Sequence, residues 1–402
     1  MLLKLPEEGL PSSPDSIRGE MLALMTKFGC VVNDDYDEAA EVYSRMIQNL
    51  SSDENFYLIV NPTLQCNCRC WYCIETHTES RMSDEMLEKL KQTILNILSR
   101  VKSITISFFG GEPLLEFKRI VKPLMEWSRE VCKDNGKELN LVFTTNSLLM
   151  TDERIAYLKD YPNQSYQITI DGNRECHNKT RILKGGDSYA KVVDTIKKLA
   201  ACRIQVVMRL NLSHDNVDTA YDIIEDFRDF PAEYKKYISL SCQQIWQDSV
   251  NGPLAEKFME INKRFLDIGI LPMPKKFNWT RESCYGDRLN SVVVNYNGDL
   301  FKCSAVDYLS DEPIANLEEV DLISTLENDF KRYLDEKMSD PSCRTCRVLP
   351  MCTRGCYKKV MLSKEGCPHP TDEKKDYLII NALEQMAQDH KINEVMTETE
   401  FS

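Results

Sequence analysis

Apolar runs and helix-periodic stretches alternate along the middle of the chain, from about residue 56 to residue 246. Short continuous apolar runs, such as FYLIVNP at 56–62 and SITISFF at 103–109, predict buried strands. Between them, apolar residues recur at helical spacing over 83–100, with Ser83 as a candidate N-cap. The other predicted strands are 139–146, 167–171, 204–212 and 238–246, and the other predicted helices are 114–134, 151–160, 188–201 and 214–228.

This alternation predicts an α/β fold. Strands that are apolar throughout are typical of a parallel sheet covered by helices. Six strand–helix units indicate a partial (β/α)6 TIM barrel. In such barrels chemistry collects at the C-terminal ends of the strands, so polar motifs there are candidates for the active site.

The segments on either side of this core differ from it. Residues 28–32 form a short apolar run that predicts a strand, and 36–50 predict a helix. In 284–370 Cys is frequent and helical periodicity is weak, while Asn297-Gly298 predicts a hairpin over 291–303. The expected segments are an N-terminal helical accessory segment (1–55), the barrel (56–280), a Cys-rich domain (281–370), and a closing helix over 372–390 within a tail (371–402).

Composition narrows the classes of function. The 402 residues, 42% of them hydrophobic, allow one large core and a smaller module. A net charge of −13 argues against a nucleic-acid partner, which would need clustered Lys and Arg. The N-terminus lacks the apolar run of a signal peptide, and no stretch approaches a membrane span. We therefore expect a cytoplasmic protein with no membrane partner.

Sixteen Cys is a large number for such a chain. In a reducing compartment, grouped Cys indicate metal or cluster ligands rather than disulfides. Ten of the sixteen fall into two sets, at 66–73 and 284–367. The others lack a recurrent spacing and are interpreted as small buried hydrophobic residues: Cys30, Cys68, Cys132, Cys176, Cys202 and Cys242.

The first set reads Cys66-x3-Cys70-x2-Cys73 and directly follows the first predicted strand. Three thiolates on one short loop can hold three irons of a cubane cluster and leave the fourth without a protein ligand. An open metal position suits catalysis. The alternative is a zinc site that lacks its fourth ligand, for which Cys68 is a candidate.

The stretch CNCRCWYC resembles the cluster loop of radical S-adenosylmethionine (radical SAM) enzymes, including the aromatic Tyr72 before the last Cys. The resemblance extends to the end of the second strand, where the family has a GGE motif that contacts the amino group of the cofactor. It implies a [4Fe–4S] cluster that cleaves S-adenosylmethionine to a 5′-deoxyadenosyl radical, which abstracts hydrogen from the substrate. The residues matching the GGE motif are Gly110, Gly111, Glu112 and Pro113.

Further matches follow the order of the strands. Asn146 ends the third predicted strand, and Asp171 ends the fourth within a stretch that resembles the family's DG…H…R pattern. On this resemblance Arg181 pairs with the carboxylate of the cofactor, and Arg209 in the fifth strand points to the same role. Asp171 is interpreted either as a cofactor contact or as a helix or turn cap. A supporting role is expected for His177.

The second set resembles the SPASM extension of radical SAM enzymes that modify peptides and proteins, such as sulfatase-maturing enzymes and sactisynthases. Its order is Cys-x13-Gly-x4-Cys, a gap, Cys-x2-Cys-x5-Cys-x3-Cys, a gap, and a last Cys. The resemblance implies two auxiliary [4Fe–4S] clusters, and so three in all. The alternative is a zinc ribbon. The implied ligands are Cys284, Cys303 and Cys356 for the first auxiliary cluster, and Cys343, Cys346, Cys352 and Cys367 for the second.

Two departures separate this sequence from the sulfatase-maturing subgroup. That subgroup carries an extra Cys shortly after the first SPASM Cys, whereas 286–294 has none. It also carries an Asp base directly after the second SPASM Cys, where this chain has Ser304. The first auxiliary cluster is therefore left with three identified ligands. The nearby carboxylates Asp287 and Asp307 are expected to have helix-end or hairpin surface roles.

The resemblance covers about 56–370 and implies an oxidoreductase that matures a ribosomally synthesised peptide. The modification would be a thioether, C–C or C–O crosslink, or an epimerisation. The implied partners are a peptide substrate with a leader sequence, which 1–55 would help to hold, and an electron donor such as flavodoxin or ferredoxin. The alternatives are a formylglycine-forming sulfatase maturase and a non-catalytic zinc-binding or electron-transfer protein.

Overall fold

The computed structural model describes residues 36–51, 54–183, 186–248, 254–273, 284–349, 351–352 and 355–380. The chain forms two compact units. The sheet unit comprises Ser52–Lys275 and Tyr285–Lys331. The cysteine unit comprises Met1–Ser51, Lys276–Cys284 and Arg332–Ser402. The strand predicted at 28–32 lies outside the described residues.

The sheet unit contains one ten-stranded sheet in the order β10-β9-β8-β1-β2-β3-β4-β5-β6-β7. Its central strands are parallel to one another, and the sheet does not close on itself. The predicted partial barrel is therefore confirmed. The six central strands are β1 (Asn55–Val60), β2 (Ser103–Phe108), β3 (Glu138–Thr145), β4 (Gln164–Ile170), β5 (Gln205–Leu212) and β6 (Ile238–Gln244).

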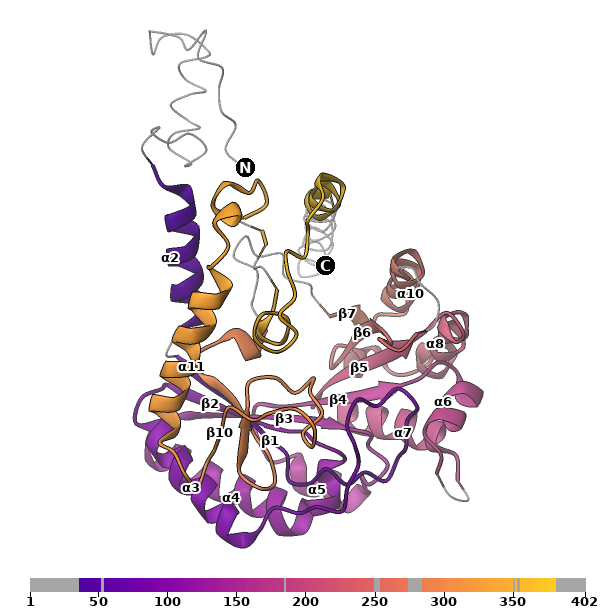
Figure 1. Ribbon diagram of the computed structural model, residues 1–402. Coiled ribbons are helices and arrows are strands. Elements are labelled where there is room, and N and C mark those ends of the chain that lie inside the picture. The colour runs from indigo at the N-terminus through magenta and orange to yellow at the C-terminus, as the bar shows by residue number, and fades with distance from the viewer. Residues whose placement is uncertain are drawn as a thin grey trace, which may run out of the picture. The chain divides into compact units, whose positions relative to one another are not determined.

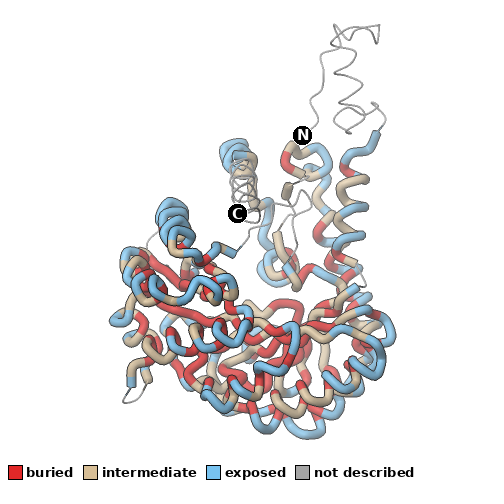
Figure 2. Tube along the Cα trace, turned by 180° about the vertical axis from the view of Figure 1, so that it is seen from behind, coloured by how far each residue is buried: buried red, intermediate tan, exposed pale blue. Residues whose placement is uncertain are grey.

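Helices connect these strands and lie along the outer side of the sheet (Figure 1). As predicted, Ser83 begins the first of them, because its hydroxyl accepts a hydrogen bond from the Met86 amide. Buried residues concentrate along the strands, and exposed residues lie on the outer faces of the helices (Figure 2). The helices are α3 (Asp84–Leu98), α4 (Lys122–Asp134), α5 (Asp152–Leu158), α6 (Arg174–Thr180), α7 (Ser188–Ala201), α8 (Ala220–Arg228), α9 (Ala232–Lys235) and α10 (Ala255–Asp267).

The helix predicted over 114–134 begins irregularly. A 3-10 turn, η1 (Pro113–Glu116), is followed by a π turn, η2 (Phe117–Val121), before α4 starts. Pro123 explains part of this irregularity, because it has no amide to donate to the preceding turn. A 3-10 turn, η3 (Val217–Thr219), similarly delays the helix predicted from residue 214.

The predicted hairpin joins the same sheet. Strands β8 (Ser291–Val294) and β9 (Asp299–Phe301) pair in antiparallel fashion, and Gly298 takes a φ of +87° in the turn. β8 also pairs in parallel with β1, on the edge of β1 opposite to β2. The sheet thus extends beyond the six barrel strands. The short strands at its two ends are β10 (Ala315–Asn316) and β7 (Leu271–Pro272).

The expectation of weak helix in 284–370 is wrong, because α11 spans Leu322–Lys337. Its apolar positions, including Leu322, Leu326 and Phe330, recur every four residues, but charged residues between them mask the pattern. In the cysteine unit, α2 (Glu38–Leu50) confirms the helix predicted over 36–50. Of the closing helix predicted at 372–390, residues 372–380 are helical and the rest lie outside the described residues. Short turns complete the chain: η4 (Tyr285–Asp287), η5 (Pro341–Thr345) and η6 (Lys358–Leu362).

Within the residues that the structure describes, no helix is long and apolar enough to cross a membrane.

Candidate cofactor and cluster sites

The loop that follows β1 carries the first cysteine set. Cys66 and Cys70 are half-buried against the hydrophobic core, and Cys73 is exposed. Cys68, which was considered as a fourth zinc ligand, is buried in the core with 2% of its surface exposed. Burial thus separates Cys68 from the other three cysteines, while no group of three or more Cys, His, Asp or Glu side chains in the described part of the chain lies close enough to hold a metal ion, so the three-cysteine cluster remains a prediction.

Hydrogen-bond donors approach the sulfur atoms of this loop. The Cys68 amide lies 3.4 Å from Cys66 Sγ, and Asn146 Nδ2 lies 3.8 Å from the same sulfur. His77 Nε2 lies 3.5 Å from Cys73 Sγ. N–H groups directed at sulfur are among the features that set the potential of an iron–sulfur cluster. The donor set of the loop thus fits a thiolate-bound cluster.

Burial disfavours the thiolate forms in the absence of iron. It raises the pKa of Cys70 to about 11 and also raises the pKa of Cys73. The pKa of Cys66 is raised by its hydrogen bond with Cys68 and by burial. Binding of a cluster must therefore displace protons from these thiols.

The two glycines of the GGE motif allow the chain to pack against its own cluster loop. A Cβ at Gly110 would lie 2.5 Å from the Thr63 carbonyl oxygen, and one at Gly111 would lie 2.3 Å from that of Gln65. The amides of Gly111 and Glu112 donate to these same carbonyls, at 3.1 and 2.9 Å. These contacts position the cluster loop against the end of β2, and the approach of the motif to a cofactor remains a prediction.

Glu112 is fully buried and bridges two strand ends. One carboxylate oxygen accepts from Thr145 Oγ1 at 2.7 Å and from the Leu114 amide at 3.0 Å. The other accepts from the Asn146 amide at 2.8 Å. Burial raises the pKa of this carboxyl group, while its hydrogen bonds oppose that change. Glu112 thus orients Asn146, and its contact with the amino group of a cofactor remains a prediction.

Tyr72 links the cluster loop to the ends of β4 and β5. Its hydroxyl donates to Asp171 and accepts from Arg181 at 2.8 Å and from Asn211 at 3.1 Å. Arg181 Nε also donates to Asp171, at 2.6 Å. Asp171 is thus held in a buried ion pair, and the N-cap of α6 is Asn173. The structure directs Arg181, predicted to bind the cofactor carboxylate, toward Asp171 and Tyr72.

Arg209 differs from Arg181 in having no acidic partner. It lies in β5 and donates to Asn211 Oδ1 at 2.7 Å. Across the described part of the chain, no carboxylate forms an ion pair with it, and burial lowers the pKa of its guanidinium. Arg209 is half-buried, and a partly desolvated cation without an anion is costly, so this position fits the carboxylate of a bound S-adenosylmethionine.

His177 has the supporting position expected of it. It is fully buried, and its Nδ1 accepts from the Asp171 amide at 3.2 Å. Burial lowers the pKa of the ring to about 4, so the neutral form is present at physiological pH. His177 therefore shapes the turn that carries Asp171.

Four cysteines of the second set line one cavity of the cysteine unit, although among the described residues no group of three or more Cys, His, Asp or Glu side chains lies close enough to hold a metal ion. This cavity has a volume of about 40 Å³. Cys356, assigned to the other auxiliary cluster, is not among its lining residues. The grouping matches the ligand set inferred for the second auxiliary cluster. The lining residues are Val42, Tyr43, Met46, Lys337, Cys343, Cys346, Val348, Leu349, Cys352, Cys367, Pro368 and His369.

The ligands predicted for the first auxiliary cluster belong to both units. Cys303 follows β9 in the sheet unit and is 8% exposed, and its Sγ accepts from the Ala305 amide at 3.3 Å. Cys284 is exposed and Cys356 is half-buried, and both belong to the cysteine unit. This cluster remains a prediction.

Acidic residues near the hairpin were expected to have helix-end or hairpin surface roles. Asp287 ends the η4 turn, as a helix-end role requires, but only 2% of it is exposed. Asp307 accepts from Thr76 Oγ1 at 2.7 Å, in the segment after the cluster loop. Ser304 donates its amide to the Tyr285 hydroxyl at 2.8 Å. The sequence alone gave no reason to select Glu75, yet burial near Asp307 raises its pKa to about 8.

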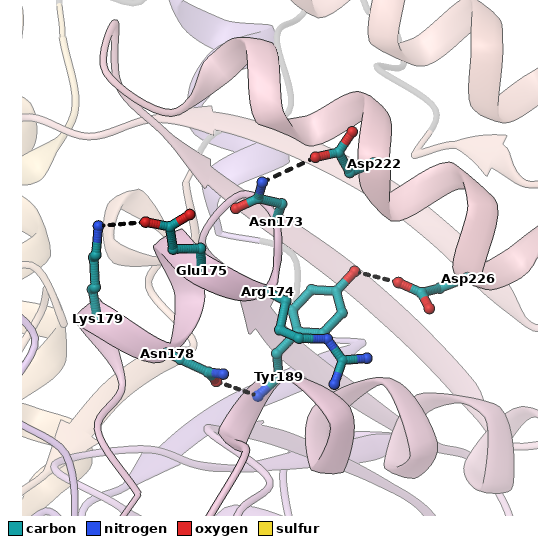
Figure 3. Close-up of a pocket in the computed structure, with 8 residues that line it drawn as sticks. All are labelled: Asn173, Arg174, Glu175, Asn178, Lys179, Tyr189, Asp222 and Asp226. Atoms are coloured by element: carbon teal, nitrogen blue, oxygen red, sulfur yellow. Dashed lines mark hydrogen bonds and ion pairs between the residues drawn. The ribbon is translucent and has the colours of Figure 1, made fainter.

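A larger hollow lies on the outside of the sheet unit among α6, α7 and α8 (Figure 3). Its volume is about 740 Å³. Its polar side chains are paired with one another: Asn173 with Asp222, Tyr189 with Asp226, and Lys179 with Glu175. Because these polar side chains already have partners in the protein, the hollow is interpreted as part of the helix packing.

Comparison with known proteins identifies the central region of the chain. Residues 60–227 match the sequence model of the Radical SAM superfamily. The chain is 26% identical over 181 residues to the sporulation killing factor maturation protein SkfB of Bacillus subtilis, which covers 44% of this chain and 42% of SkfB. It is 25% identical over 195 residues to the Fe-coproporphyrin III synthase of Methanosarcina barkeri, which covers 47% and 45%. The chain thus spans less than half the length of both relatives.

Solved structures show the same fold. Native anSMEcpe with bound AdoMet superposes with a TM-score of 0.63 at 17% identity, covering 84% of this chain and 98% of that one. Streptococcus suis SuiB bound to precursor peptide SuiA superposes with a TM-score of 0.57 at 14% identity, covering 87% and 86%. These similarities support the partial barrel found here.

Proposed function

We propose that residues 60–227, which match the sequence model of the Radical SAM superfamily, bind S-adenosylmethionine and one [4Fe–4S] cluster, and that the enzyme is a SPASM-type peptide maturase. The observation that carries the proposal is the cavity that Cys343, Cys346, Cys352 and Cys367 line. Those four thiols form the ligand set that the SPASM resemblance assigns to one auxiliary cluster. A plain radical SAM domain has no need of such a cavity.

In this proposal the catalytic cluster is held by Cys66, Cys70 and Cys73. Bound S-adenosylmethionine supplies a 5′-deoxyadenosyl radical that abstracts a hydrogen atom from the substrate. Arg209 pairs with the cofactor carboxylate, and Glu112 fixes the Asn146 amide beside the loop. Tyr72 ties the same loop to β4 and β5.

Two auxiliary clusters complete the proposed set. The second is held by the four cysteines of the cavity. The first is assigned to Cys284, Cys303 and Cys356 on the SPASM resemblance. The chain would then hold three [4Fe–4S] clusters, or about twelve irons.

The proposed substrate is a ribosomally synthesised peptide with a leader sequence. SkfB is by its name a maturation protein, and SuiB was solved with a precursor peptide. A cofactor held at the Cys66, Cys70 and Cys73 loop would supply the radical that takes one hydrogen atom from a substrate C–H bond. A cluster held by the SPASM cysteines would accept one electron while a base takes one proton, so a crosslinked peptide would lose two hydrogens in all. A flavodoxin or ferredoxin would supply the electron that starts each turnover.

Formylglycine formation is less well supported. Ser304 stands where that chemistry places an Asp base, and its amide and hydroxyl are both engaged with the Tyr285 hydroxyl. Turnover of a Cys- or Ser-containing sulfatase peptide by the reduced enzyme would restore this alternative.

The proposal is tested first by iron content after anaerobic reconstitution. The parent chain should bind about twelve irons, and Cys343→Ala should lose about four of them. Incubation of the reduced enzyme with a small Cys-rich or repeat-bearing peptide encoded beside the gene should lower the peptide's mass by two hydrogens. A protein that binds zinc in place of iron contradicts the proposal, as does a Cys343→Ala variant that keeps all its iron.

A further inference from the structure

We propose that helix α2 of the N-terminal segment forms one wall of the second auxiliary cluster site and excludes water from that cluster. The sequence suggested that residues 1–55, a separate partner or the barrel itself holds a leader peptide, and this remains a prediction. The contacts of α2 indicate a further role for this segment. This inference rests on the proposed function only in taking the four-cysteine cavity to be a cluster site.

The wall consists of one face of α2. Val42, Tyr43 and Met46 line the cavity together with its four cysteines. These positions are separated by one, three and four residues, so they lie on the same side of a helix. The residues between and beyond them on the opposite side, Ser44, Arg45 and Gln48, are exposed. The helix thus presents its apolar side to the thiols and its polar side to solvent.

An ion pair fixes the start of this helix to the cysteine loop. Asp37 is the N-cap of α2, and its Oδ1 accepts from the Ala40 amide at 2.9 Å. Its other carboxylate oxygen lies 2.5 Å from an amino group of Arg344, which stands between Cys343 and Cys346. One side chain therefore both caps the helix and holds it against the loop. The ion pair is exposed, so it adds little to the free energy of folding, and its main effect is to fix the position of α2 relative to the cysteine loop.

A second contact orders the far side of the cavity. Lys337 lines the cavity, and its Nζ donates to the Gly355 carbonyl oxygen at 2.6 Å and to the Tyr333 hydroxyl at 2.7 Å. The end of α11 is thereby tied to the segment between Cys352 and Cys356. With α2 on one side and this segment on another, the cysteines have ordered surroundings.

The expected consequence is electrostatic. A [4Fe–4S] core with four thiolates carries a larger negative charge when reduced, and a dry apolar wall disfavours the more highly charged state. An apolar α2 therefore keeps the potential of this cluster low. It also limits access of water and oxygen, so the cluster should be lost slowly in air.

The test uses the anaerobically reconstituted full-length chain. The signal of the second auxiliary cluster is identified as the one lost in Cys343→Ala, and its midpoint potential is measured by a redox titration followed by electron paramagnetic resonance. Val42→Glu and Met46→Glu place a carboxylate against the cluster, which disfavours the more negative reduced state, so they should shift this potential to a more negative value and speed the decay of the signal in air. Gln48→Glu places the same charge on the exposed side of α2 and should change neither quantity. Met46→Ala, which opens the wall without adding charge, should speed the decay.

The outcomes separate the inference from the proposed function. If Cys343→Ala loses no iron, the cluster itself is absent and the proposed function fails. If the cluster is present but Val42→Glu, Met46→Glu and Met46→Ala all behave like Gln48→Glu, α2 is not its wall. Complete loss of the cluster in Met46→Glu, with unchanged circular dichroism and a normal Gln48→Glu, supports the inference. Equal loss in Gln48→Glu overturns it.

Discussion

At the scale of single residues, the sequence identified the charged groups but not their partners. Arg181 was the first candidate for a cofactor carboxylate, from the DG…H…R resemblance, and Arg209 was added because a charge inside an apolar strand needs a partner. The fold distinguishes them. Arg181 donates hydrogen bonds to Asp171 and Tyr72, whereas Arg209 donates to the side-chain amide of Asn211. Such pairings depend on residues far apart in the chain, and one sequence does not give them.

Replacing Arg209 by Met should weaken the binding of S-adenosylmethionine without lowering the free energy of unfolding. The loss of a charge-assisted pair with the cofactor carboxylate costs about 1.5–3 kcal/mol, so affinity for S-adenosylmethionine should fall by tenfold or more. Stability should be unchanged or higher, because a half-buried cation without an acidic partner is removed. Isothermal titration calorimetry and urea unfolding measure the two effects. Arg228→Met, at an exposed Arg paired with Glu225, is the matched control.

That prediction fails if Arg209→Met binds S-adenosylmethionine as tightly as the parent chain.

His177 should make stability depend on pH. Its pKa is lowered from 6.5 to about 4 in the fold, so the unfolded chain takes up a proton at a higher pH than the folded one. Stability from this group is present above pH 6.5 and is lost as the pH falls toward 4. Between pH 7.5 and 5 the loss is roughly 2 kcal/mol. His177→Gln should lose less unfolding free energy than the parent over this interval in urea titrations, and an equal loss would show that His177 does not titrate in this way.

At the scale of elements, periodicity predicted the central strands and most of their helices. It failed at α11, where charged residues between the apolar positions concealed a sixteen-residue helix. It could not show that Pro113 and Pro123 make the helix after β2 begin as 3-10 and π turns. The motif at Gly110 and Gly111 indicated a site where the backbone packs closely against another group. In the structure that group is the backbone of the cluster loop.

Gly111→Ala should therefore displace the cluster loop. The added methyl group would lie 2.3 Å from the Gln65 carbonyl oxygen and 2.5 Å from that of Leu64. We expect the reconstituted variant to lose about four irons, those of the catalytic cluster, while its circular dichroism is unchanged. Gly136→Ala, where no atom lies within 4 Å, is the control and should keep its iron. Full iron content in Gly111→Ala would contradict the packing described here.

At the scale of the whole molecule, the sequence predicted six parallel strands but not their extension into ten. The parallel pairing of β8 with β1 joins residues more than 200 positions apart, and nothing local in either strand specifies it. The cysteine spacing, in contrast, predicted a group of four thiols, and those four cysteines line one cavity, although the cluster itself remains a prediction. Ligand spacing is a local property of the sequence, whereas strand order depends on the complete fold.

The central claim is that this chain generates a radical from S-adenosylmethionine at the loop of Cys66, Cys70 and Cys73. The most direct measurement is the amount of 5′-deoxyadenosine released when the anaerobically reconstituted protein is given S-adenosylmethionine and a chemical reductant. The parent chain should release 5′-deoxyadenosine and methionine in equal amounts, and Cys73→Ala should release neither. An iron-loaded parent chain that binds S-adenosylmethionine but releases no 5′-deoxyadenosine would contradict the claim.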